Sequence, residues 1–111
     1  MDCIFCKIAA GEITCDKVIE TDSVLAFRDI NPQAPTHVLV IPKRHIYSLH
    51  EATEDDDLGA LLLAAKEVAH SEGVDRAGYR LVINCGQHGG QTVDHLHVHV
   101  LGGRQMTWPP G

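Results

Sequence analysis

One stretch of the sequence decides both the fold and the chemistry: His95-Leu96-His97-Val98-His99-Val100-Leu101. Histidine and aliphatic residues alternate along it, and successive side chains of a β-strand point to opposite faces of a sheet. The pattern predicts a strand over residues 96–101, with aliphatic side chains on one face and imidazoles on the other. A half-buried strand with a polar face would account for one histidine, but three in strict alternation indicate a functional site.

The spacing of the three histidines along a strand disfavours their binding one metal ion together. Side chains two positions apart on a strand are about 6.6 Å apart, and His95 and His99 are separated by roughly twice that distance. Zinc binds histidine nitrogen at about 2.1 Å, so one ion cannot easily take all three without a sharp bend of the chain. We therefore expect His95, His97 and His99 to have different roles.

A glycine-rich loop over residues 85–92 precedes the histidines and is suited to binding phosphate. Gly89 and Gly90 would let backbone N–H groups approach an anion closely, and Asn84 lies at the end of a predicted strand. The loop lacks the P-loop pattern. A neutral imidazole can attack phosphorus without a metal. The alternative is a metal site built from two of the histidines and a third ligand elsewhere, as in a zinc hydrolase.

The remaining patterns predict an α+β fold with about five mostly antiparallel strands, one long helix and a short N-terminal helix. The short helix spans residues 3–10 and ends at Gly11. The long helix is capped by Thr53 and ends at Gly73. Its apolar stripe comprises Leu58, Leu61, Leu62, Ala65, Val68 and Ala69. The strands are expected at residues 17–20, 24–29, 37–41, 79–84 and 96–101.

Length and composition indicate one globular domain over residues 1–111. Apolar residues make up 44% of the chain, and the net charge of −6 argues against a nucleic-acid surface. No segment reaches the roughly 20 apolar residues of a membrane span, and the N-terminus does not resemble a signal peptide. We therefore expect a cytoplasmic protein whose four cysteines are metal ligands or small residues rather than disulfides.

The pair Cys3-x-x-Cys6 has three interpretations: a redox dithiol, half of a zinc site, or chance. A thioredoxin-like motif would follow a strand, whereas this pair lies at the start of the chain. A zinc site needs two further ligands.

Residues 95–101 resemble the signature of the histidine-triad (HIT) family of nucleotide hydrolases and transferases. Similarity to the Hint branch, in its bacterial form with a Cys-x-x-Cys zinc site, extends over four flanking segments: Cys3–Ile8, Phe27–His37, Gly89–Gln91 and Leu101–Gly111. The resemblance covers essentially the whole chain. It implies a homodimer that hydrolyses purine nucleoside 5′-phosphoramidates, such as AMP-lysine or AMP-NH2, through a nucleotidyl-histidine intermediate.

The resemblance also implies roles for individual residues. His97 is the nucleophile, and His37 orients it or relays a proton to it. The phosphate is contacted by His99, Asn84, the Gly90 backbone and the Thr92 hydroxyl. Asp29 holds the ribose with Ile30 beside it, and a plain turn residue is the alternative for Asp29. The base pocket is lined by Ile4, Phe5, Ile8 and Phe27, for which plain hydrophobic core is the alternative. Trp108 lies in a proline-rich tail that reaches the partner's site.

Relatives that carry such a cysteine pair bind structural zinc with two histidines. Their positions correspond here to His45, which follows Pro42-Lys43-Arg44, and to His95. The resemblance therefore implies a structural zinc held by Cys3, Cys6, His45 and His95, with no cofactor required for the chemistry. Two other functions stay open: a nucleotide-binding or regulatory protein with weak turnover, and a zinc-dependent hydrolase.

Overall fold

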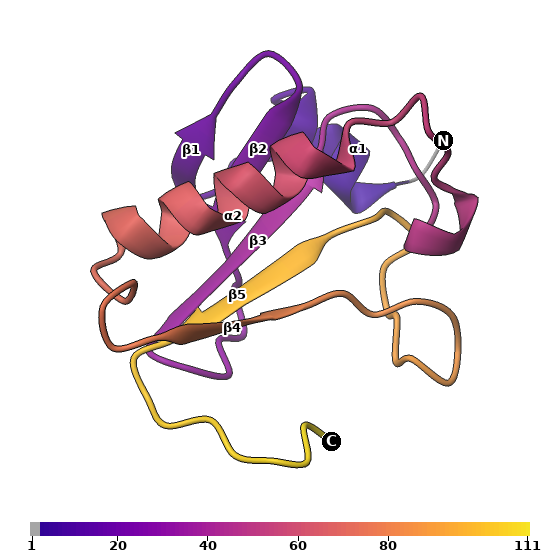
Figure 1. Ribbon diagram of the computed structural model, residues 1–111. Coiled ribbons are helices and arrows are strands. Elements are labelled where there is room, and N and C mark those ends of the chain that lie inside the picture. Colours follow the sequence, from indigo (N-terminus) through magenta and orange to yellow (C-terminus); the bar gives the residue numbers. More distant parts are fainter. Residues whose placement is uncertain (1–2) are drawn as a thin grey trace.

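The computed structural model describes residues 3–111 and shows an α+β fold (Figure 1). Five strands form one antiparallel sheet in the order β1-β2-β3-β5-β4. The strands are β1 (Lys17–Glu20), β2 (Val24–Arg28), β3 (Thr36–Pro42), β4 (Tyr79–Val82) and β5 (Val98–Gly102). The helices are α1 (Ile4–Ala9), the short 3-10 helix η1 (Leu49–Glu51) and α2 (Leu58–Ser71). The fold class expected from the sequence is confirmed.

Alternating side chains give the sheet two buried faces. On one face, covered by α2 (Figure 1), the valines and Ala26 of the central strands pack against the apolar stripe of that helix. On the other face, Phe5 and Ile8 of α1 pack against a second cluster: Leu25, Phe27, Leu39 and Ile41. His99 pairs across the sheet with Leu39, so its imidazole lies on the face that carries α1.

The alternation of the histidine segment is confirmed, but its strand starts later than predicted. β5 begins at Val98, so only His99 lies within it. Before that point the backbone N–H of Leu96 donates to the carbonyl of Ile46 at 2.7 Å, which draws the chain away from the sheet. Leu96 is nevertheless buried in the α2 cluster, and the ring of His97 meets Phe5 on the opposite face.

The long helix also starts later than predicted. Asp57 caps it by accepting a hydrogen bond from the N–H of Ala60 at 3.0 Å, whereas Thr53 belongs to a separate turn in which its N–H donates to Asp56. Leu62 is 47% exposed, so the buried stripe is narrower than expected. Neither α2 nor any other helix within residues 3–111 has the length and apolarity needed to cross a membrane.

Candidate active site and metal centre

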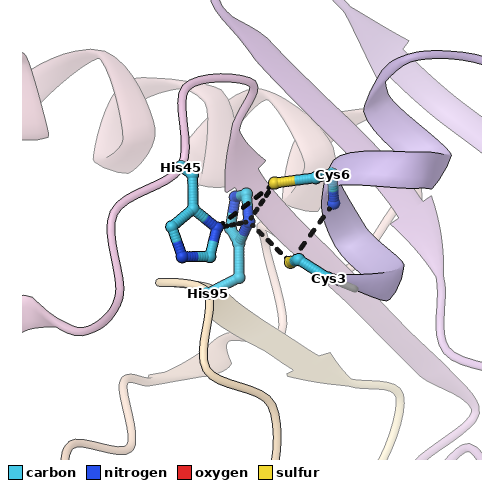
Figure 2. A group of neighbouring side chains, drawn as sticks. All are labelled: Cys3, Cys6, His45 and His95. Carbon is cyan, nitrogen blue, oxygen red and sulfur yellow. Dashed lines mark hydrogen bonds between the residues drawn. The ribbon is translucent and has the colours of Figure 1, made fainter. Parts of the chain in front are cut away.

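Four sulfur and nitrogen donors meet where α1 approaches two loops (Figure 2). Cys3 and Cys6 lie at the start of α1, His45 follows β3, and His95 precedes β5. Their ligand atoms all lie within 4.8 Å of one another. Three of the separations are 3.2–3.3 Å: His45 Nδ1 to His95 Nδ1, His45 Nδ1 to Cys6 Sγ, and His95 Nδ1 to Cys3 Sγ. Such spacings suit a tetrahedron around an ion bound at about 2.0–2.3 Å.

The surroundings of His95 fit a metal ligand. The residue is fully buried, and its Nε2 lies 2.8 Å from the carbonyl oxygen of Pro42. A carbonyl oxygen can only accept, so Nε2 carries the proton and Nδ1 turns its lone pair toward the two cysteines. Zinc-binding histidines are commonly held in this way by a backbone carbonyl. Two thiols and two imidazoles are a ligand set of structural zinc sites, and these four residues fit that ion.

Asp29, His37 and His99 form a second group of possible ligands, but their hydrogen bonds indicate a different role. The backbone N–H of Gln33 donates to His37 Nδ1 at 3.0 Å, so the proton of neutral His37 lies on Nε2. That atom is 2.8 Å from His99 Nδ1 and 3.4 Å from the Asp29 carboxylate. It therefore acts as a donor, and the group is a hydrogen-bond relay rather than a metal site.

Different hydrogen-bond partners place the ring proton of neutral His97 and His99 on different nitrogens. His99 accepts at Nδ1, so its neutral ring carries a proton on Nε2. His97 donates from Nδ1 to the carbonyl oxygen of His95 at 2.7 Å, so its neutral ring has a lone pair on Nε2. Within residues 3–111, no buried side-chain nitrogen or oxygen lacks a hydrogen-bond partner, so neither Nε2 is a buried atom without one. The two rings, with centroids 5.0 Å apart, thus offer one acceptor nitrogen and one N–H donor side by side.

Burial keeps the relay histidines uncharged. Burial, and after it the neighbouring His97 and His37, lower the pKa of His99 to about 4, although the Asp29 carboxylate opposes the shift. Burial also lowers the pKa of His37, an effect that the Asp29 carboxylate only partly opposes. Both rings are therefore neutral at pH 7, which is the form that the relay requires.

A cavity of about 610 Å³ lies beside these imidazoles. Its walls come from α1, β2, β3 and the segment before β5, and the rings of Phe5 and Phe27 meet edge to face at 5.5 Å. Most of the residues expected to bind a nucleotide line it: Ile4, Phe5, Ile8, Phe27, Asp29, Ile30, Thr92, His97 and His99. Phe5, Ile8 and Phe27 are also buried core, whereas Ile30 is fully exposed at the rim.

Asn84, which immediately precedes the glycine-rich loop, and Gly90 within that loop do not line the cavity. The side-chain amide of Asn84 donates to the carbonyl of Gly89 at 2.7 Å, and Gly90 has a φ of +76° that favours glycine. A Cβ atom at Gly89 would lie 2.3 Å from the Cys85 carbonyl oxygen, so this position needs glycine. The loop is thus built by residues that the sequence analysis expected to contact phosphate.

Two further expected residues lie outside the cavity wall. His37 stands behind His99 and contacts that ring, not His97 as the sequence analysis expected. Trp108 is 82% exposed in the C-terminal tail.

The sequence analysis missed seven residues that line the cavity. The sequence could have predicted Leu39, because side chains two positions apart on a strand lie on the same face, and Leu39 follows His37 by two. Residues 13–16, which precede β1, have no periodic pattern that would have predicted their place in the cavity wall. The missed residues are Ile13, Thr14, Cys15, Asp16, Arg28, Leu39 and Val93.

Comparison with known proteins identifies the family. The HIT domain matches residues 10–106. The 14 kDa zinc-binding protein of Brassica juncea is 54% identical, over 99% of this chain and 100% of that protein. A HIT family hydrolase from Legionella pneumophila has a crystal structure with a TM-score of 0.96 and 55% identity, over 99% of this chain and 100% of that chain. The histidine triad nucleotide-binding protein of Candida albicans gives a TM-score of 0.85 at 38% identity, over 97% of this chain and 83% of that chain. The match to the family model and the similarity to these relatives show that this chain belongs to the HIT family.

Proposed function

We propose that the protein hydrolyses purine nucleoside 5′-phosphoramidates, of the AMP-lysine or AMP-NH2 type, through a nucleotidyl-His97 intermediate. The observation that carries this proposal is the unprotonated Nε2 of His97 beside the Nε2–H of His99 at the wall of a largely apolar cavity. The relatives named as a HIT family hydrolase and a histidine triad nucleotide-binding protein support the same class of activity.

The reaction proceeds in two steps. His97 Nε2 attacks phosphorus while the P–N bond to the amine breaks, and the amine leaves with a proton taken up from water. The Nδ1–H of His97 stays hydrogen-bonded to the His95 carbonyl, which stabilises the positive charge of the nucleotidyl-imidazole. Water then cleaves the new P–N bond and releases the nucleoside monophosphate. Throughout, His99 donates its Nε2–H to a phosphoryl oxygen.

The remaining groups bind the nucleotide. The apolar side chains of α1 and Phe27 enclose the purine base, of the adenine or guanine type. Asp29 holds the ribose through Oδ2, which also lies 3.4 Å from His37 Nε2, while its Oδ1 accepts from the N–H of Asn31. Thr92 lines the cavity near the phosphate. Asn84 and the N–H of Gly90 shape the loop that approaches the phosphate.

The zinc site has a structural role in this proposal. None of Cys3, Cys6, His45 and His95 lines the cavity, so the proposed chemistry belongs to other residues. The bound ion would join α1 to the loops that carry His45 and His95, and it would contribute directly to the free energy of folding. The Brassica juncea relative named as a zinc-binding protein supports an ion of this kind.

We further propose that the protein is a cytoplasmic homodimer. Large apolar side chains remain exposed in the single chain, among them Leu63 at 64% and Trp108 at 82%. Burial against a second copy would remove such surface from water. Reduced cysteines are needed as zinc ligands, and the cytoplasm keeps thiols reduced.

Release of AMP from adenosine 5′-phosphoramidate tests the proposed activity. The zinc-loaded protein should release AMP and the His97→Ala variant should not. A His50→Ala variant, altered at an exposed histidine of η1 outside the cavity, should match the wild type. AMP binding without AMP release by the wild type would contradict the proposal and favour a nucleotide-binding protein.

A further inference from the structure

Helix α1 and its N-cap carry two sets of residues, one in the metal centre and one in the cavity wall. Cys3 and Cys6 point toward His45 and His95 in the metal centre (Figure 2). The residues between and after the cysteines, namely Ile4, Phe5 and Ile8, line the cavity. One short helix therefore joins the metal centre to the wall that would meet the base of a nucleotide.

The metal ligands supply the polar attachment of this helix. Within the described part of the chain, every hydrogen bond between residues 3–13 and the rest of the molecule involves the thiol of Cys3 or Cys6. The backbone groups of this segment that make hydrogen bonds pair with one another. A helix of six residues is not stable by itself in water, so its position depends on the apolar contacts of Phe5 and Ile8 and on the two cysteines.

Phe5 lies between the two sites. Its ring contacts the metal ligand His95 at a centroid distance of 5.9 Å and the proposed nucleophile His97 at 5.2 Å. It also packs against Phe27 in the cavity wall. A shift of α1 that follows loss of the metal would therefore displace the cavity wall at Phe5.

We propose that occupancy of the metal centre sets the affinity of the cavity for the nucleotide base, and that a bound base in turn tightens metal binding. This inference rests on the function proposed above. The two effects must be equal in size, because coupling between two binding sites is reciprocal. Ribose and phosphate would contact Asp29, Thr92 and His99, none of which belongs to α1, so their share of the binding should depend less on the metal than the share of the base.

The rate at which zinc passes from the loaded protein to a chromophoric chelator tests the coupling. The rate is measured with AMP or with ribose 5-phosphate, each at the same multiple of its own Kd. If zinc were lost only through global unfolding, both ligands would slow the loss equally, because ligand stabilisation depends only on the ratio of concentration to Kd. The loaded protein is used throughout, so the test does not require a folded metal-free form.

We expect AMP to slow zinc transfer at least about fivefold more than ribose 5-phosphate does, the lower end of typical coupling between sites. Ile4→Ala, at the cavity rim on α1, should reduce this difference. Lys66→Ala, on the exposed surface of α2 and outside the cavity, should leave it unchanged. Equal slowing by the two ligands in the wild type would overturn the inference. Failure of AMP to bind the zinc-loaded protein in calorimetry would instead overturn the proposed function, and the inference with it.

Discussion

His97 and His99 lie on the same face of the histidine segment. Backbone groups nevertheless place the ring proton on Nδ1 in neutral His97 and on Nε2 in neutral His99. The carbonyl oxygen of His95 accepts a hydrogen bond from the Nδ1–H of His97. The N–H of Gln33 fixes His37, which in turn fixes His99. Assigning a nucleophile and a hydrogen-bond donor to these rings thus requires no unusual charge state, because two main-chain groups determine which nitrogen of each ring carries a proton.

The proposed roles of His97, His99 and His37 predict how much kcat falls when each is replaced by alanine. His97→Ala should lower kcat by about 10⁴-fold or more, because the nucleophile is lost. His99→Ala should cost about 10²–10³-fold, the usual effect of removing one donor to a developing charge. His37→Ala should cost less, since it acts through His99. Steady-state kinetics with calorimetry of AMP binding checks the order, and equal losses for His97→Ala and His99→Ala would contradict the assigned roles.

The low pKa of His99 predicts that stability falls on mild acidification. The pKa of His99 is about 4 in the folded chain, whereas the ordinary pKa of histidine is 6.5. Between these values the unfolded chain binds more protons, so the free energy of unfolding decreases as pH falls through this range. Urea denaturation of the zinc-loaded wild type and His99→Asn should show a shallower decline in the variant. Parallel curves would show that His99 does not contribute.

At the scale of elements, α1 links the amino-terminal cysteines to the cavity. The helix is only six residues long, and Cys3 caps it by accepting a hydrogen bond from the N–H of Cys6 at 3.4 Å. The same sulfur lies 3.3 Å from His95. Local helix formation and long-range attachment therefore use one side chain, which makes α1 the element most sensitive to the state of the metal centre.

Loss of a metal ligand should destabilise the protein more than it impairs the chemical step. For Cys3→Ser, Cys6→Ser or His45→Ala we expect the Tm to fall by more than about 10 °C, because structural zinc contributes directly to folding. The kcat of the folded fraction should change far less. Cys85→Ser, a cysteine outside the metal centre, is the matched control for thermal denaturation. Native protein that contains no zinc by elemental analysis would defeat this prediction.

Alternation and turn residues predicted most of the elements, while their starting points depended on competing contacts. The faces of residues 96–100 followed from the period of two. The start of β5 did not, because the hydrogen bond from Leu96 to Ile46 joins segments far apart in sequence. The start of α2 was misplaced because several acidic residues in succession can each act as a cap, and Asp57 is the one that does.

At the scale of the whole molecule, the site is assembled from segments that no local pattern connects. The contact between His37 and His99 spans 62 positions in the sequence. The resemblance to the HIT family named both residues but paired His37 with His97. Likewise, resemblance supplied His45 as a metal ligand, whereas spacing alone left the cysteine pair open. The wall formed by residues 13–16 could not be predicted, since it depends on where α1 leads the chain.

The exposed tail predicts a role in substrate choice. The tail that carries the exposed Trp108 contacts β4, where the guanidinium of Arg80 donates to the Thr107 carbonyl at 2.8 Å. If this tail reaches the partner's cavity, a protein truncated after Met106 should remain a dimer in sedimentation experiments. Its kcat/KM should change unequally among phosphoramidates with small and bulky amines. Unchanged selectivity would count against a tail that shapes the site.

Mass spectrometry of the protein quenched during turnover tests the central claim most directly. With adenosine 5′-phosphoramidate as substrate, we predict that the intact mass increases by one adenylyl group and that peptide mapping places it on His97. The His97→Ala variant should show no such increase while still binding AMP. An adenylyl group found on another residue, or retained by the His97→Ala variant, would contradict the account of this site.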